Sequence, residues 1–183
     1  MKYVALLRGI NVGGNNIIKM LDLKQVFEKA GYTKVGTLIQ SGNVVFESKN
    51  EDKQEITTHL EAVLSKAFHY TAKLVIRSHK EFKKIIAEVP NDWKHDTDLR
   101  CYILFVKEPV TEKDVEKEIE IKEGIDFFST GVGVVYMSTK MEGLTKSKFA
   151  KFIGKKVYKD VTIRNFKTSR MILEIMENII SAK

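Results

Sequence analysis

Residues 8–18, Arg8-Gly9-Ile10-Asn11-Val12-Gly13-Gly14-Asn15-Asn16-Ile17-Ile18, separate an apolar run at residues 3–7 from an amphipathic pattern at residues 20–30. The run predicts a buried strand over residues 3–8, and the pattern, which ends before Gly31, predicts a helix. The chain therefore begins with a strand that leads through a long glycine-rich loop into a helix. Loops of this kind often present backbone N–H groups to anions.

The elements that come next along the chain complete a known order. Residues 35–40 and 43–48 predict two strands joined by a tight turn, residues 52–68 a helix with one apolar stripe, and residues 72–77 a fourth strand. The order strand, helix, strand, strand, helix, strand is that of ferredoxin-like folds.

The same order recurs in the second half. A short helix at residues 78–88 and a polar connection at 90–98 lead to a strand at 100–106, an acidic helix at 111–122 and a hairpin of residues 125–129 and 134–138. A helix at 146–153, a strand at 159–163 and a helix at 168–180 complete the chain. We therefore expect an α+β protein of two tandem ferredoxin-like βαββαβ units, each an antiparallel sheet covered by helices. The expected divisions are an N-terminal subdomain 1–89, a connection 90–98 and a C-terminal subdomain 99–183.

Composition points to an ordinary globular protein. The 183 residues are 43% hydrophobic and 30% charged, and such a chain can bury a substantial core. No apolar stretch approaches the roughly 20 residues of a membrane helix, and the apolar run after Lys2 is too short for a signal-peptide core. We expect a cytoplasmic protein that does not bind a membrane. The single Cys101 excludes an internal disulfide and a cysteine-rich metal site, and we expect a buried, inert thiol.

The net charge of +7 is unevenly distributed. Residues 140–170 carry ten Lys or Arg against two acids, whereas residues 108–126 carry eight acids against three lysines. A basic surface attracts nucleic acid or acidic partners through a field that salt screens. The alternative is that these lysines only solvate the outer side of a helix. The opposed surfaces could also pair with each other in a homo-oligomer, so a monomer and a homodimer both remain open.

Topology brings two polar segments together. In a βαββαβ unit the first two strands run parallel, so the loop after the first strand and the turn after the second emerge at the same end of the sheet. We expect a site there for a phosphate- or carboxylate-bearing small molecule. Its candidate residues, with Asn16 and Lys19 beside them, are Arg8, Gly9, Asn11, Gly13, Gly14, Asn15, Gln40, Ser41, Gly42 and Asn43. The alternative is that these residues serve only to turn the chain and that Arg8 is a buried ion-pair partner.

A third polar segment precedes the last helix. Arg164 and Asn165 complete the candidate binding residues, because free N–H groups at a helix start, with Lys167 and Arg170 nearby, suit an anion. If this junction faces the glycine loop, the two halves form one composite cleft. The alternative is simple capping of the helix by Asn165 or Thr168.

Several familiar chemistries are excluded or disfavoured. Residues 9–14 have the spacing of a Walker loop, but Asn15 and Asn16 occupy the positions of its Lys and Ser or Thr. Residues 44–47 lack the aromatic pattern with which ferredoxin-like units bind single-stranded RNA. The four histidines share no ligand spacing, and residues 95–98 are better interpreted as a solvated loop than as a metal site. We therefore expect no metal and no cofactor, and no neighbouring residues form a catalytic set that would decide whether the protein is an enzyme.

Three segments also carry a resemblance. They are Leu6-Leu7-Arg8-Gly9-Ile10-Asn11-Val12-Gly13-Gly14, Ile39-Gln40-Ser41-Gly42-Asn43-Val44-Val45-Phe46 and Thr162-Ile163-Arg164-Asn165-Phe166. The chain resembles, over its whole length, the bacterial family catalogued as domain of unknown function 1697. The third segment departs from that family's usual Arg-Asn-Trp by having Phe166. The resemblance implies two similar α+β subdomains and implies no activity.

Three functions therefore remain open. The first is a cytoplasmic binding protein for an anionic small molecule, which uses the polar glycine-rich loops. The second is weak, non-specific nucleic-acid binding by the basic surface of residues 140–170, with an affinity that falls steeply as salt rises. The third is a structural or homo-oligomeric interaction module.

Overall fold

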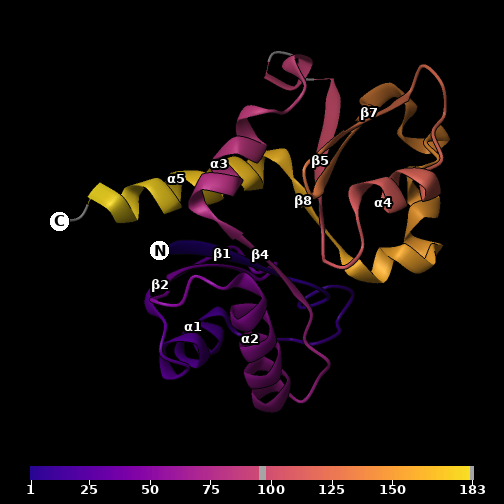
Figure 1. Cartoon of the computed structure of the whole chain (residues 1–183). Coiled ribbons are helices and arrows are strands. Elements are labelled where there is room, and N and C mark those ends of the chain that lie inside the picture. Colours follow the sequence, from indigo (N-terminus) through magenta and orange to yellow (C-terminus); the bar gives the residue numbers. More distant parts are fainter. Residues whose placement is uncertain (95–97, 182–183) are drawn as a thin grey trace. The chain divides into compact units, whose positions relative to one another are not determined.

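The computed structural model describes residues 1–94 and 98–181 (Figure 1). The chain divides into two compact units. The first unit is Met1–Lys83 together with the chain from Met171 onward, and the second unit is Lys84–Arg170.

The first unit is built on an antiparallel sheet of four strands. The strands are β1 (Lys2–Leu7), β2 (Thr33–Leu38), β3 (Asn43–Glu47) and β4 (Leu74–Ser78), in the spatial order β2-β3-β1-β4. The crossover helices are α1 (Met20–Lys29) and α2 (Lys53–Phe68), which lie on one face of the sheet (Figure 1). This is the strand order and helix placement of a ferredoxin-like unit, as predicted.

The core of the first unit lies between the sheet and its two crossover helices. Tyr3, Ala5 and Leu7 alternate along β1 and face this core, and Leu23 and Phe27 of α1 pack into it. All five residues are almost fully buried. Residues Val4 and Leu6 on the opposite face are buried as well, so β1 is a central strand covered on both sides. A run of apolar residues without alternation is the expected sequence of such a strand.

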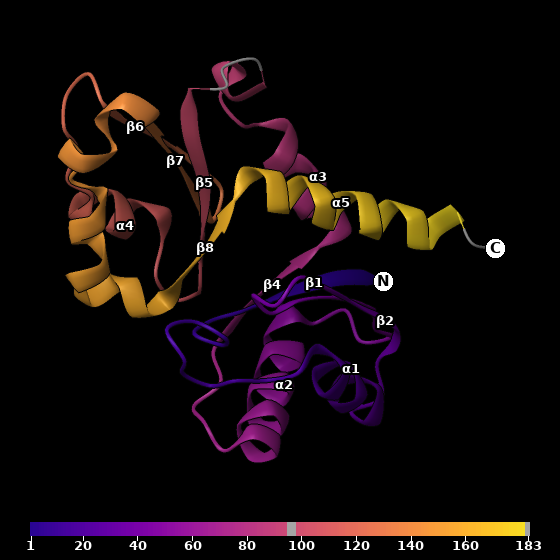
Figure 2. The ribbon, with the colours of Figure 1, turned by 180° about the vertical axis from the view of Figure 1, so that it is seen from behind.

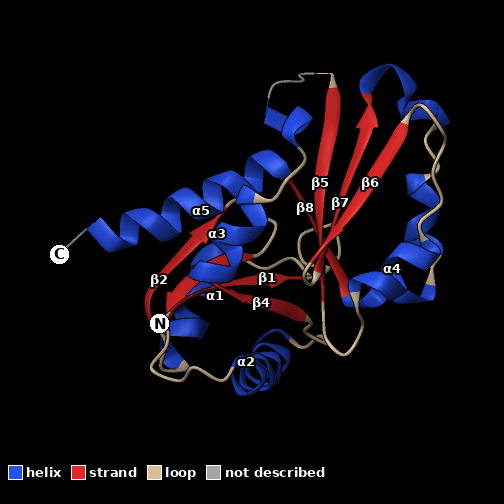
Figure 3. Cartoon of the chain, turned by 45° about the horizontal axis from the view of Figure 1, so that its top comes forward, coloured by secondary structure: helices blue, strands red, loops and turns tan. Residues whose placement is uncertain are grey.

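The second unit repeats the topology. Its strands are β5 (Leu99–Val106), β6 (Asp126–Gly131), β7 (Val134–Lys140) and β8 (Val161–Asn165), in the spatial order β6-β7-β5-β8 (Figure 3). The first crossover is α4 (Glu112–Glu118). Even single backbone bonds recur at equivalent places. Leu7 N–H donates to Gly42 O at 2.8 Å in the first unit, and Val106 N–H donates to Gly133 O at 3.0 Å in the second.

The second crossover of this unit corrects one prediction. The expected helix at residues 146–153 is instead a series of 3-10 turns, η2 (Met141–Lys146), η3 (Phe149–Gly154) and η4 (Lys156–Asp160). The chain breaks at Ser147 and Lys148 because the buried carboxylate of Asp126 accepts hydrogen bonds from the Ser147 hydroxyl at 2.6 Å and from the Lys148 N–H at 2.9 Å. These long-range bonds replace helical ones in the middle of the expected helix.

The same carboxylate contributes to the early end of α4. The expected helix reached residue 122, but α4 ends at Glu118 and the chain is already extended at Ile119. The Lys122 N–H donates to Asp126 at 2.9 Å instead of to a helical carbonyl. A turn toward β6 therefore replaces the last expected helical turn.

The chain passes between the two units within α3 (His79–Ala87) and α5 (Phe166–Ser181). A short 3-10 turn, η1 (Asn91–Lys94), comes after α3. Figure 2 shows α3 and α5 side by side, and Lys83 Nζ pairs with Glu177 Oε1 at 2.9 Å. The predicted divisions 1–89, 90–98 and 99–183 follow the order of elements along the chain. They keep α3 and α5 whole, whereas the boundaries of the compact units fall within these two helices. The divisions stay a prediction. In the part of the chain that the structure describes, no helix is both long and apolar enough to span a membrane.

Candidate functional site

The loop after β1 and the turn after β2 lie together at one end of the first sheet. The side-chain amide of Asn11 donates to Gln40 O at 2.8 Å, which joins the two segments directly. The Leu7–Gly42 backbone bond adds a second link. The expectation that topology brings these segments side by side is therefore confirmed. We call residues 8–19 and 40–43 the glycine rim.

Asn11 holds the loop in shape as well as holding it to the turn. Its amide also donates to Ile18 O at 2.9 Å, and its Oδ1 accepts from the Ile18 N–H at 2.8 Å. The residue has a φ of +53°, a left-handed conformation that asparagine tolerates better than most residues. Because its polar atoms are used inside the protein, Asn11 positions the glycine rim and is not itself a free ligand group.

The centre of the loop is a small hairpin. Asn15 N–H donates to Val12 O at 3.1 Å, and Asn11 N–H donates to Asn16 O at 3.1 Å. The tip between them is Gly13-Gly14, with φ values of +60° and +79°. Asn16 braces the base of the hairpin by donating to Gly9 O at 2.9 Å. The tip is thus held by bonds on both sides while it stays exposed.

Two expected site residues in the turn are structural. Asn43 is fully buried and donates to Leu38 O and to Ser41 Oγ, both at 3.0 Å. Gly42 is packed so tightly that a Cβ there would lie 2.7 Å from Ile10 Cδ1 and 2.8 Å from Leu7 Cβ. Both residues shape the turn and neither offers a group to a ligand.

The groups left on the outside of the glycine rim are mostly backbone. Gly9, Gly13, Gly14, Asn15 and Gln40 are exposed, and Arg8 and Ser41 are partly buried. Among the described residues, the N–H groups of Gly13 and Gly14 donate no hydrogen bond to a protein acceptor. Two more basic residues lie nearby. Lys19 is exposed before α1, and Lys73 is adjacent to Arg8 because the Arg8 N–H donates to Lys73 O at 2.9 Å. The exterior therefore combines open N–H donors with cationic side chains.

Arg164 and Asn165 belong to the second unit, where they have local roles. The Arg164 side chain is 8% exposed and its Nη1 donates to Ile163 O at 2.9 Å. Burial lowers the pKa of its guanidinium to about 10, so the group is still charged at neutral pH. Asn165 Oδ1 accepts from the Lys167 N–H at 2.8 Å, which is the capping role that the sequence offered as the alternative to anion binding.

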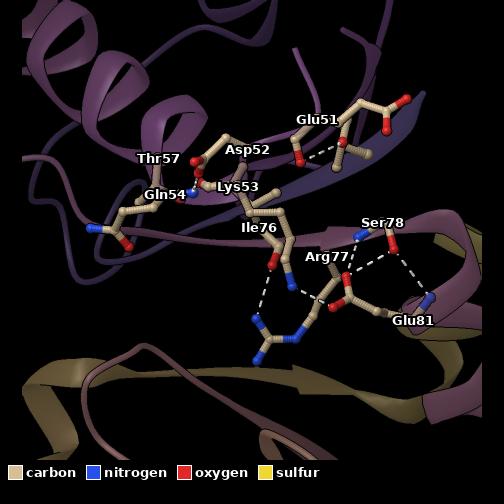
Figure 4. Close-up of polar contacts among 10 residues, drawn as sticks. Glu51, Asp52, Lys53, Gln54, Thr57, Ile76, Arg77, Ser78 and Glu81 are labelled. Carbon is tan, nitrogen blue, oxygen red and sulfur yellow. Dashed lines mark hydrogen bonds and ion pairs between the residues drawn. The ribbon is translucent and has the colours of Figure 1, made fainter. Parts of the chain in front are cut away.

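A second polar cluster in the first unit was not anticipated (Figure 4). Ser78 and Glu81 form a reciprocal cap at the start of α3, because Ser78 N–H and Oγ donate to Glu81 Oε2 at 2.8 Å and Glu81 N–H donates back to Ser78 Oγ at 3.3 Å. Lys53 of α2 forms a short ion pair with Glu81. The sequence signal was present, because Ser-x-x-Glu is the pattern of a capping box.

The electrostatics of this cluster fit a structural role. Burial raises the pKa of the Glu81 carboxyl, but the hydrogen bonds from Lys53 and Ser78 outweigh burial and leave that pKa below its usual value. The neighbouring Arg77 donates from Nη1 to Ile76 O at 2.8 Å (Figure 4). The cluster ties the starts of α2 and α3 together, and its carboxylate is already saturated with donors.

The acidic and basic stretches of the second unit partly neutralise each other. Lys155 Nζ lies 3.2 Å from Glu120 Oε1 and 3.7 Å from Glu118 Oε2, and Lys151 Nζ lies 3.2 Å from Glu120 Oε2. We expected separate surfaces of opposite charge, but at these residues the two stretches meet.

Side chains that commonly bind metal ions do not cluster among the described residues. No group of three or more His, Cys, Asp and Glu side chains lies close enough to hold a metal ion within residues 1–94 and 98–181. His95, Asp96 and Thr97, which we expected to form part of a solvated loop, lie outside those residues. Cys101 is buried, as expected of an inert thiol.

Similarity to known proteins gives the family and no activity. The family model described as "Protein of unknown function (DUF1697)" matches residues 1–136. No curated protein matches the sequence. A solved structure of a conserved bacterial protein, SP0830 from Streptococcus pneumoniae, is 28% identical, with a TM-score of 0.83 over 96% of this chain and 98% of that one. An unknown protein from Galdieria sulphuraria is 14% identical over 90% of this chain and 96% of its own, with a TM-score of only 0.26. The chain therefore belongs to the DUF1697 family of proteins of unknown function.

Proposed function

We propose that the glycine rim binds a small molecule that carries a phosphate or carboxylate group. The observation that carries the proposal is the hydrogen bond from the Asn11 side-chain amide to Gln40 O at 2.8 Å, which holds the loop with the exposed Gly13-Gly14 tip against the turn after β2. A braced loop with open N–H donors is prepared for an anion, because little ordering remains to be done on binding.

A comparison of the two units supports the proposal. The connection from β1 to α1 spans residues 8–19, whereas the equivalent connection from β5 to α4 spans only residues 107–111. Both connect the same elements of the same topology, and connections of about 2 to 6 residues are usual at such places. The fold does not require the longer loop, and long ordered loops are often functional.

Charge also fits the proposal. Arg8 and Lys19 stand at the two ends of the loop after β1, and Lys73 precedes β4 at the same end of the sheet. Cationic side chains beside backbone N–H donors are the usual combination in phosphate and carboxylate sites. The proposal is limited to binding, because no neighbouring residues in the sequence form a catalytic set.

We also propose that this binding takes place in the cytoplasm. The chain has a single cysteine, which is buried, and so it depends on no internal disulfide. Proteins of reducing compartments have this character.

Calorimetric titration of the protein with pyrophosphate and with citrate tests the proposal. The wild type is expected to bind at least one of the two anions saturably, and Arg8→Gln and Lys19→Gln are each expected to weaken that binding about 3- to 10-fold, as loss of one charge-assisted contact should. Lys29→Gln removes an equal charge from an exposed position in the last turn of α1, the end of that helix away from the glycine rim, and serves as the matched control. Absence of saturable binding, or equal weakening by the control, would contradict the proposal.

A further inference from the structure

We propose that the second unit carries a separate site for an organic cation with an alkylated ammonium group. The site is a cavity of about 340 Å³, at the lower end of the range of about 300–1,000 Å³ that small-molecule sites span. It lies on the sheet face that bears Tyr136 and Ser138, and all of its lining residues belong to the second unit. They are Glu88, Pro90, Asp92, Trp93, Phe127, Phe128, Ser129, Tyr136 and Ser138.

Aromatic rings form the walls of this cavity. Phe127 and Ser129 of β6 pair with Ser138 and Tyr136 of β7, so these four side chains stand on the same face of the sheet. The Trp93 ring meets the Tyr136 ring edge to face, with centroids 5.9 Å apart and an interplanar angle of 85°. Aromatic faces carry partial negative charge and attract cations, most strongly in the case of tryptophan.

The walls are fixed before any ligand arrives. The Tyr136 hydroxyl donates to Ile85 O at 2.9 Å, and Trp93 packs against Phe166 with ring centroids 5.4 Å apart. Trp93 is only 6% exposed and Tyr136 only 2%. A rigid aromatic wall keeps its geometry, so binding costs little side-chain entropy.

One wall already attracts a cation. Lys140 Nζ lies 5.9 Å from the centroid of the Phe127 ring, and that ring is 42% exposed. The Lys140 ammonium is thus both a demonstration that the ring accepts positive charge and a competitor for it. Its presence gives the proposal a specific consequence, because removing Lys140 should strengthen the binding of an external cation.

The charged side chains that line the cavity are negative, as a site for a cation requires. Among the described residues that line the cavity, Glu88 and Asp92 are the charged ones, and both are acidic. Glu88 also lies 3.6 Å from Lys84 Nζ, in a pair whose two side chains are 45% and 63% exposed, and exposed pairs of this kind are weak. Burial first, and the Glu88 carboxylate second, raise the pKa of Tyr136, so Glu88 acts electrostatically on the aromatic wall. Aromatic faces and carboxylates together favour a cation and disfavour an anion.

The rest of the lining selects an alkylated cation over a metal ion. Pro90 and Phe127 present apolar surface. No group of three or more His, Cys, Asp and Glu side chains that could hold a metal ion is found among the described residues, and two carboxylates alone are a poor metal set. Methyl groups on nitrogen spread the charge over an apolar surface that such walls can cover. This is the chemistry by which aromatic walls bind quaternary ammonium groups.

The cavity contains its own reporter. Trp93 is the single tryptophan of the chain, so intrinsic tryptophan fluorescence comes from this site alone. We would titrate the protein with choline at constant ionic strength and, in parallel, with 3,3-dimethylbutan-1-ol, which has nearly the same shape without the charge. The proposal predicts a saturable change in Trp93 fluorescence with choline. The neutral alcohol should bind with an affinity at least about 10-fold lower than that of choline.

Four variants locate the binding. Phe127→Leu and Asp92→Asn, both at exposed positions, are expected to weaken choline binding about 3- to 10-fold, and Lys140→Met is expected to strengthen it. Glu116→Gln removes one acid from the exposed side of α4 and is expected to have no effect. Near-ultraviolet circular dichroism verifies that each variant is folded.

The opposite results are equally clear. Equal affinity for choline and the neutral alcohol would show a plain apolar cavity and overturn the proposal. So would the absence of any saturable fluorescence change, and so would choline binding that Phe127→Leu and Asp92→Asn leave intact, because the cation would then bind elsewhere.

Discussion

Asn11 shows how one residue can fix the shape of a long loop. Its amide makes three hydrogen bonds, two to Ile18 and one to Gln40, and thereby fixes the glycine hairpin against the neighbouring turn. An aspartate would keep the bond from the Ile18 N–H, but it would place a carboxylate against two carbonyl oxygens. The donor half of the amide is therefore as important as the acceptor half.

We predict that Asn11→Ala lowers the free energy of unfolding by about 2 kcal/mol, because the buried Ile18 loses two hydrogen bonds and the exposed Gln40 loses one. Asn11→Asp should cost at least as much despite its similar shape. Urea unfolding of both variants measures the effect, with Asn15→Ala as a control at an exposed position of the same loop. Asn11→Asp with wild-type stability would show that the two donor bonds do not matter.

The glycines of the glycine rim differ in what they contribute. Gly9 and Gly42 have similar φ values of +68° and +73°, but only Gly42 has neighbours within 4 Å of a built Cβ. Gly9→Ala should cost about 1 kcal/mol for the left-handed backbone alone. Gly42→Ala should cost a further 1–3 kcal/mol or so, because the new methyl meets Leu7 and Ile10. Thermal or urea unfolding of the pair compares them, and equal losses would contradict the packing role.

At the scale of elements, Asp126 organises the second crossover of the second unit. Its carboxylate accepts from Thr139 Oγ1 at 2.8 Å and Ser147 Oγ at 2.6 Å, and from the N–H groups of Lys122 and Lys148, each at 2.9 Å. Burial alone would raise the pKa of Asp126, but these four donors outweigh burial and lower it. One acid thus ends α4, supports β7 and sets the break between η2 and η3.

This arrangement predicts a pH-dependent contribution to stability. The pKa of Asp126 is lower in the folded protein than in the unfolded chain, so its stabilisation is fully present above about pH 4 and is lost as the pH falls through the folded-state pKa. Asp126→Asn should cost about 3 kcal/mol at pH 7, because the amide cannot accept from all four donors. Urea unfolding at several pH values measures the gap between variant and wild type, which should narrow in acid. A gap that stays constant from pH 7 down to the acid limit of folding would rule this role out.

The elements that the sequence predicts well are those that local pattern determines. The stripe Ile56, Leu60 and Leu64 gives α2, and Asp52 caps it by accepting from the Gln54 and Glu55 N–H groups at 2.8 and 3.1 Å. The expected helix at residues 146–153 fails because its centre bonds to Asp126, a residue twenty or more positions away. Periodicity contains no information about such a partner.

The candidate site, too, was predictable from the sequence only in part. Strand topology was sufficient to predict that the loop after β1 and the turn after β2 lie side by side. It could not show that the side-chain amides of Asn11 and Asn43 donate to backbone carbonyls of the protein itself. Nor could it show that Ile10 and Leu7 pack so closely against Gly42 that a larger residue there would clash. Those roles depend on contacts between segments, which one sequence does not reveal residue by residue.

At the scale of the whole molecule, the ten Lys and Arg residues against two acids within residues 140–170 overstate the free basic surface. Lys151 and Lys155 face Glu118 and Glu120 at 3.2 to 3.7 Å, so part of the basic stretch is neutralised within the second unit. We predict that the double variant Glu118→Gln/Glu120→Gln elutes from a heparin column at higher salt than the wild type, because two lysines lose their acidic partners. Elution at the same salt would mean that these pairs do not mask the lysines in solution.

The central claim is that the glycine rim binds an anion, and amide NMR tests it most directly. Pyrophosphate is added to uniformly ¹⁵N-labelled protein at constant ionic strength, and the shift of each backbone N–H signal is followed. The account predicts saturable shifts that are largest at Gly13, Gly14 and Ser41 and much reduced in Arg8→Gln. Shifts that are absent, or that concentrate within residues 140–170 instead, would contradict it.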